Sequence, residues 1–264
     1  MKKEELNNLI EECLIRKDWN NPIIKPANAF SLREYNGYNL LTVPYLMEKR
    51  EHTQPFFATF NQIRKEGGKV KKGCKSYPII FWKLITVTKG EKIGETFPIM
   101  KSFNVFNVAD IENINFKEEK FIKPQTDVID TIKKYINREA INFTENTGNA
   151  FYQPSTDTIN IGACKTVGGY EEAIIHESVH STGHEKRLHR KDITKVNKFG
   201  SVDYATEEMV AEFGVYLIAQ TKEQKTNAVA YISTWIQALQ KQDRIKEAIK
   251  AFYQATKAEK FILQ

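Results

Sequence analysis

One segment of the chain stands apart from the rest, and it reads Ile174-Ile175-His176-Glu177-Ser178-Val179-His180-Ser181-Thr182-Gly183-His184. Its apolar residues recur at helical spacing, which predicts a helix, and Gly183 is predicted to end that helix. Within the segment lies the pattern His-Glu-x-x-His. Side chains four positions apart on a helix project from one face, so His176 and His180 can bind the same metal ion. The segment therefore predicts a metal site built on a helix.

Zinc is the metal that this pattern favours, because it binds neutral imidazole and keeps a fourth position open for water in catalytic sites. Glu177 follows the first histidine directly, so its carboxylate can take a proton from that water and return it to a leaving amine. The alternative is an ordinary amphipathic helix with two histidines in the core. Four of the five histidines lie in one short stretch, namely His176, His180, His184 and His189. This clustering favours a metal site, and one zinc ion (Zn2+) per chain is expected.

A third protein ligand is expected from a later helix. Metzincins would place a histidine at position 186, but Lys186 is there, which excludes that subclass. The segment 203–217 instead offers Glu208 and Glu212 on one helical face, and Glu208 is the predicted ligand. Glu212 is predicted to accept the spare N–H of a ligand histidine. Glu207 or Glu212 as the ligand remains an alternative, as does a purely structural role for these acids in the first turn of a helix.

Length and composition set broad limits. The 264 residues suffice for one large domain or two smaller ones, and 41% of them are hydrophobic, without a long apolar run. The N-terminus is acidic as well as basic, so no secretory signal is expected, and without a long apolar run no membrane span is expected either. Cys13, Cys74 and Cys164 are odd in number and widely spaced, which argues against a disulfide framework. A cytoplasmic protein is the resulting expectation.

Positive charge is concentrated in one N-terminal stretch. The chain carries a net charge of +6, and the basic segment, Arg64–Lys75, holds six basic residues against the single acid Glu66. Such asymmetry predicts a polyanionic partner. The basic residues are Arg64, Lys65, Lys69, Lys71, Lys72 and Lys75.

The N-terminal half is predicted to be α+β. Helices are expected at 4–18, near 40–48 and at 59–66, the last capped by Thr59 and stopped by Gly67 and Gly68. Residues 25–58 otherwise read as loops. Strands are expected at 77–88 and 96–108, joined by a turn, and a linker is expected at 113–126.

The C-terminal half is predicted to be mostly helical with a small sheet. The expected order is a helix at 127–138, short strands at 141–144, near Phe151 and at 158–161, the motif helix, and an irregular stretch at 185–202. The glutamate helix to Gln220 and helices at 227–240 and 244–257 follow. This is the order of elements expected of a compact zincin-like domain.

Aromatic residues near the basic segment suggest a surface for single strands. Lysine and arginine neutralise phosphates, while exposed bases stack on aromatic faces. The glycines of the segment would let backbone N–H groups approach phosphate. Phe81 and Trp82 fall within a strand, one face of which must belong to the core. The aromatic candidates are Tyr38, Phe56, Tyr77, Phe81 and Trp82.

Together these residues resemble the ArdC-type antirestriction proteins. In the first half the resemblance rests on residues 38–41, 59–73, 79–82 and 103–107, and in the second on 176–184, 187–188 and 204–212. Two positions depart from the family pattern: Ser181 stands where an aromatic residue is expected, and Cys74 takes a place that is usually acidic or polar.

The resemblance implies a single-stranded-DNA-binding domain at 1–115, with Asn39 among its contacts, and a zincin-like metallopeptidase domain at 125–264. It implies protection of mobile DNA from restriction and a protein or peptide substrate that is not identified. Because stacking needs unpaired bases, duplex DNA is expected to bind more weakly. One alternative is a pure DNA-binding protein with a structural or inactive zinc site. A secreted-type protease with a basic exosite is another, disfavoured by the N-terminal sequence.

Overall fold

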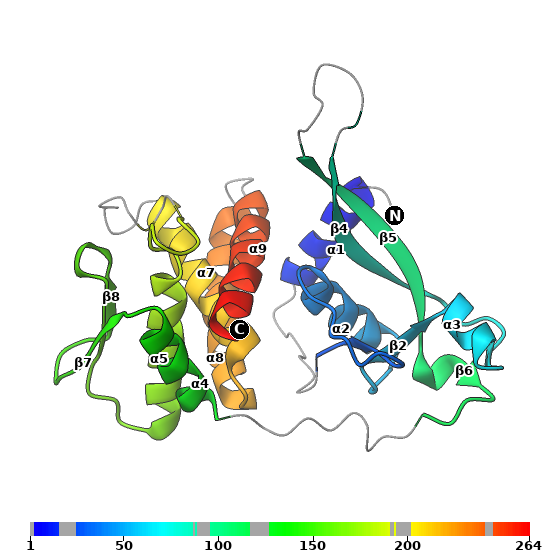
Figure 1. Ribbon diagram of the computed structural model, residues 1–264, viewed down its shortest axis with the longest axis horizontal. Coiled ribbons are helices and arrows are strands. Elements are labelled where there is room, and N and C mark those ends of the chain that lie inside the picture. Colours follow the sequence, from blue (N-terminus) through cyan, green and yellow to red (C-terminus); the bar gives the residue numbers. More distant parts are fainter. Residues whose placement is uncertain are drawn as a thin grey trace. The chain divides into compact units, whose positions relative to one another are not determined.

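The structure is a computed structural model that describes residues 3–15, 25–86, 88, 96–116, 127–190, 193, 202–240 and 245–264. The chain divides into two compact units (Figure 1). One comprises Met1–Cys13 and Asn20–Lys123, and the other comprises Leu14–Trp19 and Pro124–Gln264. The first unit combines helices with a four-stranded sheet, and the second is mostly helical with a small sheet, which confirms the predicted α+β class.

The N-terminal unit is built on a sheet whose strands lie in the order β1 (Ala27–Asn28), β2 (Phe56–Thr59), β5 (Thr96–Asn107) and β4 (Tyr77–Thr86). The strands β4 and β5 form the predicted antiparallel hairpin, which is long and twisted (Figure 1). The strand β2 is antiparallel to β5, and β1 is parallel to β2. The hairpin therefore joins the sheet through β5 and leaves β4 at its edge.

Helices and short elements complete this unit. They are α1 (Lys3–Ile15), α2 (Asn39–Lys49), α3 (Phe60–Lys65), the 3-10 turn η1 (Val108–Asp110) and the strand pair β3 (Lys69–Val70) and β6 (Ile111–Glu112). Thr59 caps α3 as predicted: its hydroxyl accepts from the Gln62 N–H at 3.2 Å, and its own N–H donates to the Gln62 side chain at 2.9 Å. Gly67 follows with a φ of 77°, which the left-handed end of the helix requires.

Four short strands lie where the sequence predicted none. Residues 25–58 were expected to form loops around one helix, but they also provide β1 and β2, while β3 and β6 pair beside α3. Each of these strands is two to four residues long. A stretch of that length is too short for hydrophobic alternation to identify. These strands exist because the tertiary fold supplies their partners.

The core of the N-terminal unit lies between α2 and the sheet. The rings of Phe57 and Tyr77 meet edge to face with centroids 4.8 Å apart. Their apolar neighbours are fully or almost fully buried, and the cluster consists of Val43, Met47, Phe57, Tyr77, Ile79 and Val105. The base of the β4–β5 hairpin is therefore anchored in a packed core.

The C-terminal unit begins with α4 (Val128–Arg138), which Asp127 caps as predicted. A three-stranded sheet follows in the order β7 (Asn142–Glu145), β9 (Thr158–Ile161) and β8 (Phe151–Gln153), with β7 parallel and β8 antiparallel to β9. The short 3-10 turn η3 (Pro154–Thr156) joins β8 to β9. The remaining helices are α5 (Val167–Ser181), α7 (Val202–Ile218), α8 (Lys222–Gln240) and α9 (Ile245–Ile262).

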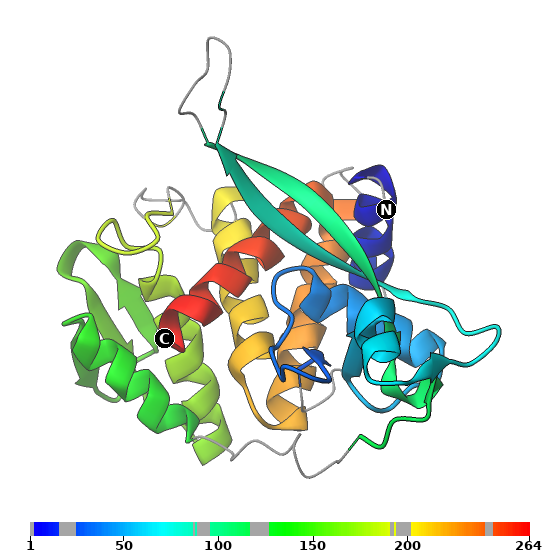
Figure 2. The same ribbon diagram turned by 45° about the vertical axis from the view of Figure 1, so that its right-hand side comes forward.

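The helix α5, which carries the His-Glu-x-x-His pattern, is the centre of this unit. It packs against β8 and β9 on one side and α7 on another, and α9 runs across α7 (Figure 2). A Cβ atom added to Gly214 of α7 would overlap the side chain of Val179 of α5, so this glycine allows the two helices to approach closely. The close approach brings the carboxylates of α7 within reach of the histidines of α5.

No helix within the described ranges combines the length and hydrophobicity that crossing a bilayer requires.

Candidate functional site

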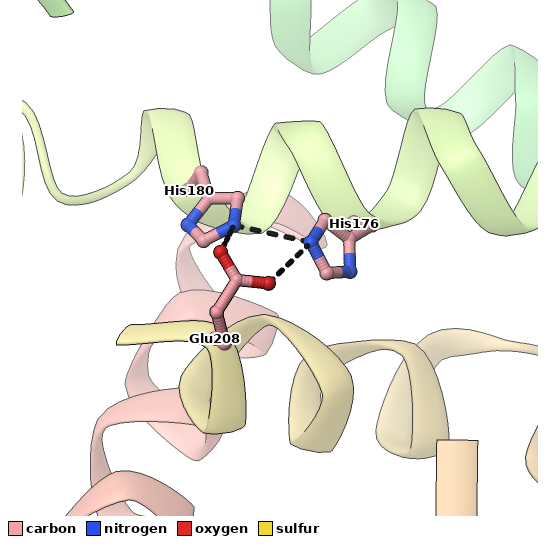
Figure 3. A group of neighbouring side chains, drawn as sticks. All are labelled: His176, His180 and Glu208. Atoms are coloured by element: carbon pink, nitrogen blue, oxygen red, sulfur yellow. Dashed lines mark hydrogen bonds and ion pairs between the residues drawn. The ribbon is translucent and has the colours of Figure 1, made fainter. Parts of the chain in front are cut away.

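Three side chains from two helices converge in the C-terminal unit (Figure 3). His176 and His180 project from α5 toward Glu208 of α7. The two histidine Nε2 atoms lie 3.1 Å apart, and the Glu208 carboxylate oxygens lie 3.6 Å from Nε2 of His176 and 3.7 Å from Nε2 of His180. Tetrahedral zinc with nitrogen and oxygen ligands separates its donor atoms by about 3.3 Å. The three donors therefore fit the zinc ion that the sequence predicts.

The second ring nitrogen of each histidine faces a carboxylate. Nδ1 of His176 lies 3.2 Å from Oε1 of Glu212, and Nδ1 of His180 lies 3.2 Å from Oε1 of Glu207. A neutral imidazole that donates its Nδ1–H to a carboxylate carries the lone pair on Nε2. Both Nε2 lone pairs are then directed toward Glu208, an arrangement that a cation satisfies. Glu212 thus lies beside the second ring nitrogen of His176.

Arg190 holds Glu207 in the interior. Its Nη2 lies 2.6 Å from Oε1 of Glu207 and its Nε lies 3.0 Å from Oε2, while it also donates to backbone and hydroxyl oxygens at the end of α5. Burial raises the pKa of Glu207, but Arg190 and His180 outweigh burial and lower the pKa to about 2. A Cβ atom on Gly183 would lie 2.9 Å from Nη2 of Arg190. Gly183 therefore makes room for this guanidinium.

Glu177 lies next to the ligands and is 7% exposed. Burial raises its pKa, and the neighbouring His180 and His176 offset part of that increase. Burial also lowers the pKa of His176, but hydrogen bonds with Glu208 and Glu212 outweigh burial and raise this pKa to about 10, so a bound cation would take the place of the proton on Nε2. The site is thus rich in buried carboxylate, and a bound cation would compensate that charge.

A second buried network ties the small sheet to the end of α5. Arg187 donates from Nε to the carbonyl of Ser181 at 2.7 Å and from Nη1 to Asp157 at 3.0 Å, and its Nη2 also contacts Asp157. The hydroxyl of Tyr152 donates to Asp157 at 2.8 Å. Asp157 lies in the turn between β8 and β9 with a φ of 47°. Arg187 therefore fixes β8 relative to the helix that carries Glu177.

The structure places the predicted metal-site residues together. His176, Glu177 and His180 lie on α5, and Glu208 and Glu212 lie on α7. Sequence reasoning missed Arg190, Arg187 and the contact between Glu207 and His180. Arg187 is one of the residues on which the resemblance rests, but no local sequence pattern predicts its partner. Arg190 lies seventeen positions from Glu207, and Arg187 lies thirty positions from Asp157.

The cations of the basic segment lie on the surface of the N-terminal unit. Arg64 and Lys65 end α3, Lys69 lies on β3, and the loop before β4 carries the remaining lysines. All six side chains are exposed: Arg64, Lys65, Lys69, Lys71, Lys72 and Lys75. Nζ of Lys71 donates to the carbonyl of Ala109 at 2.8 Å, so this ammonium group has a protein partner.

The backbone of the loop before β4 has defined contacts. Nη1 of Arg50 donates to the carbonyls of Lys75 at 3.0 Å and Ser76 at 3.2 Å. The Lys71 N–H donates to the carbonyl of Asp110 at 2.9 Å. Gly73 adopts a φ of 87°, which favours glycine. The loop therefore presents its lysines from a fixed backbone.

Several predicted DNA contacts serve the fold instead. Tyr77 is fully buried, with its hydroxyl 2.6 Å from Nδ1 of His52 and Arg50 over its ring. Burial, opposed by Arg50, raises the pKa of Tyr77 to about 12. Asn39 is also buried. Its side chain donates to the carbonyl of Ile80 and accepts from the Ile80 N–H, at the edge of β4 that does not pair with β5. Neither side chain is accessible to DNA.

The other aromatic candidates divide three ways. Phe56 is 6% exposed and belongs to the core. Tyr38 and Phe81 are partly exposed. Trp82 lies on β4, but its side chain is outside the part of the chain that the structure describes.

Two family models match consecutive parts of the chain. Residues 4–106 match the N-terminal domain of the anti-restriction factor ArdC, and residues 130–254 match a zincin-like metallopeptidase. The second match implies a zinc ion, which agrees with the donor set of His176, His180 and Glu208.

The chain is also similar to three curated proteins. The uncharacterized protein y4eC of Sinorhizobium fredii (strain NBRC 101917 / NGR234) is 25% identical over 84% of this chain and 76% of its own length. A DNA primase TraC of Escherichia coli is 28% identical over 90% of this chain, which spans only 17% of the primase. A second TraC is 26% identical, and the chain spans 24% of it.

The fold matches crystal structures of the antirestriction ArdC protein from the R388 plasmid. The metal-free form superposes with a TM-score of 0.70 and the Mn(II)-bound form with 0.68, each at 22% identity over 97% of this chain and 96% of the other. The chain therefore carries a region similar to the ArdC N-terminal domain followed by a region similar to a zincin-like metallopeptidase, in the fold of the R388 ArdC protein.

Proposed function

We propose that this protein binds single-stranded DNA through its N-terminal unit and carries a zinc-dependent peptidase site in its C-terminal unit. The domains are those predicted at 1–115 and 125–264. Its role would be to protect incoming mobile DNA from restriction in the cytoplasm. The observation that carries the enzymatic part is the placement of buried Glu177 beside three donor atoms with zinc-like spacing.

The residues of the site have separate tasks in this proposal. His176, His180 and Glu208 would hold the ion, and a zinc ion in such a site activates water and polarises a carbonyl. Glu207 and Glu212 keep the two imidazoles in the tautomer that offers Nε2.

Glu177 is the proton carrier of the proposed mechanism. Its carboxylate takes the proton of the attacking water and delivers it to the amine that leaves. Burial raises its pKa, which makes the protonated form more accessible than it is for an exposed glutamate.

Binding of single-stranded DNA is supported by the ArdC N-terminal match and by six exposed cations in one segment. Cations at fixed positions neutralise phosphates, and affinity then falls with salt. Duplex DNA offers the same phosphates but no unpaired bases, so we expect it to bind more weakly.

The alternative is a DNA-binding protein whose zinc is structural or inactive. A structural His₂Glu site has no need of a carboxylate next to its first histidine, whereas Glu177 lies there and is not part of the converging donor set. In this alternative the protein would protect DNA only by binding to it, without hydrolysing a substrate.

Substitution of Glu177 separates these two possibilities. Glu177→Gln should keep zinc and lose hydrolysis of fluorescein-labelled casein by about 100-fold or more, measured with and without a single-stranded oligonucleotide. Glu185→Gln, at an exposed glutamate just after α5, is the matched control. Equal activity of the Glu177→Gln variant and the wild type would remove Glu177 from the mechanism. A zinc-loaded wild type without hydrolysis under either condition would favour the alternative.

A further inference from the structure

The β4–β5 hairpin extends beyond the core that anchors its base. Residues that pair across an antiparallel ladder share one face of the sheet. Tyr77 pairs with Val105, and both are buried. In the next pair on that face, Ile79 of β4 is buried, whereas Phe103 of β5 is not. The side chain of Phe103 is 52% exposed. The face therefore changes from core to surface at this pair.

An aromatic stack occupies the exposed part of this face. The rings of Phe81 and Phe103 lie with centroids 4.6 Å apart and planes inclined by only 6°. Phenylalanine is usually buried, and stacked rings that are offset from each other are one of the two geometries that aromatic pairs prefer. A parallel pair that leaves one ring half exposed presents a flat π surface. Such a surface can be extended by another planar ring.

Two lysines flank the stack on the same face. Lys101 pairs directly with Phe81, and Lys83 pairs with Ile99, which is itself 43% exposed. Both ammonium side chains are exposed, and among the residues that the structure describes neither forms an ion pair with a carboxylate. The face thus combines a stacked aromatic pair with positive charge. This is the composition of surfaces that bind single-stranded nucleic acid.

We propose that Phe81 and Phe103 form a base-stacking platform for single-stranded DNA and that Lys83 and Lys101 contact its phosphates. The proposal rests on the DNA-binding function proposed above and adds a second contact region to the basic segment. Bases within a duplex already stack on each other and expose only their edges, so the platform would select unpaired strands. The basic segment, which has charge but no exposed aromatic stack, would not make this selection.

The test compares two polyanions of equal charge. One is a fluorescent deoxythymidine oligomer, and the other is the same backbone with abasic tetrahydrofuran residues. We expect the wild type to prefer the thymidine oligomer by roughly 5- to 100-fold for each stacked base. Phe103→Ala should abolish most of that preference and leave binding of the abasic oligomer unchanged. Both affinities are measured by fluorescence anisotropy.

Lysine substitutions should give the complementary result. Lys83→Ala with Lys101→Ala should weaken binding of both oligomers equally and flatten the slope of log affinity against log salt by about 0.7 for each lost contact. Phe103→Leu keeps an apolar side chain without a π face, so it should behave as Phe103→Ala does. Phe103→Trp should retain the preference. Tyr231→Ala, at an aromatic residue of α8 that is 44% exposed, is the matched control.

The outcomes distinguish the platform from DNA binding itself. If the wild type binds neither oligomer, the proposed DNA-binding function fails, and the platform fails with it. If it binds DNA but Phe103→Ala and Phe103→Leu keep the full preference for thymidine, only the platform is overturned. A change of oligomeric state in these variants with unchanged DNA affinity, measured by sedimentation, would assign the face to a protein contact and also overturn the proposal.

Discussion

The proposed metal site and the basic segment are held in place in opposite ways. In the C-terminal unit the functional side chains themselves are held: each ligand histidine faces a carboxylate, and Arg190 fixes one of these carboxylates in the interior. In the N-terminal unit Arg50 and Asp110 hold the backbone of the loop, while its lysine side chains are exposed. Precise geometry is needed to bind an ion, whereas phosphate contacts need only charge at the right distance.

This difference predicts how substitutions combine. Removing one buried side chain of the metal site withdraws support from its neighbours, so effects there should be large and not additive. Removing one exposed lysine deletes only its own charge, so effects in the basic segment should be small and close to additive.

The largest effect is expected from His180→Ala. This change removes one donor atom and also leaves Glu207 without its histidine partner. We expect the variant to lose its zinc during dialysis, which metal analysis by mass spectrometry measures. His189→Asn is the control, because His189 is exposed with a φ of 50° and asparagine tolerates that conformation. Full zinc occupancy in the His180 variant would refute the ligand set.

Arg190→Met should have the next largest effect, although Arg190 is not a ligand. It leaves the carboxylate of Glu207 buried without its guanidinium, which costs about 3–5 kcal/mol of unfolding free energy in comparable pairs. Loss of this support for His180 should also weaken zinc binding by about 10- to 100-fold. Denaturant unfolding and chelator competition measure the two effects.

The double variant Arg190→Met with Glu207→Gln sharpens this result. Removing the buried negative charge as well should recover part of the lost stability but not the zinc affinity, because Gln is a weaker acceptor for the His180 N–H. A single Arg190 variant with wild-type stability and zinc affinity would contradict the role assigned to this arginine.

Tyr77→Phe should have a moderate effect that is confined to stability. The change removes the hydroxyl contact with His52 and should lower the free energy of unfolding by about 1 kcal/mol. Its DNA affinity and salt slope should equal those of the wild type, because the ring is buried. A selective loss of affinity for single-stranded DNA at unchanged stability would show that Tyr77 contributes to DNA binding.

The same tyrosine gives a pH dependence with a defined sign. Its pKa is about 12 in the folded protein and 10.0 without burial, so the folded state holds this proton more tightly. The corresponding stabilisation is present below pH 10 and is lost as the pH rises toward 12. Tyr77→Phe should remove that component from the alkaline unfolding curve.

The sequence could predict those parts of the metal site that one helix encodes. His176 and His180 share α5, and Glu208 and Glu212 share α7, so helical periodicity places each pair on one face. Which carboxylate meets which ring depends on how closely the helices pack at Gly214. That distance is a tertiary property with no local signal.

The same limit applies to the fold and to the aromatic residues. The hairpin and the long helices were predictable because their patterns extend over ten or more residues. The start of α8 at Lys222, five residues before its predicted start, follows Thr221, whose hydroxyl accepts from the Gln224 N–H at 3.3 Å, so a cap rather than apolar periodicity marks this boundary. Tyr77 and Phe103 lie on one face of the hairpin, yet one is buried and the other is exposed. Alternation identifies the face but not where the core ends along it.

The smallest effects for each residue are expected in the basic segment. Replacing Lys71, Lys72 and Lys75 with alanine removes up to three phosphate contacts, and for single strands each contact contributes about 0.7 to the slope of log affinity against log salt. Lys71 also donates to the carbonyl of Ala109, so we expect its contribution to be the weakest of the three. The slope should therefore flatten by roughly 1.4 to 2.1, and the three single variants should add up to the triple variant.

Zinc content decides whether this surface is independent of the metal site. It should be unchanged in the triple lysine variant, because none of the proposed ligands is altered. The control replaces Lys222, Lys246 and Lys250, which are exposed on α8 and α9 and change the net charge by the same amount. This control variant should keep the wild-type slope. If only the net charge mattered, both triple variants would flatten the slope equally. A basic-segment variant that binds single-stranded DNA with the original slope would show that these lysines belong to an ordinary solvated turn, and the hairpin face with Phe103 would then have to carry the binding.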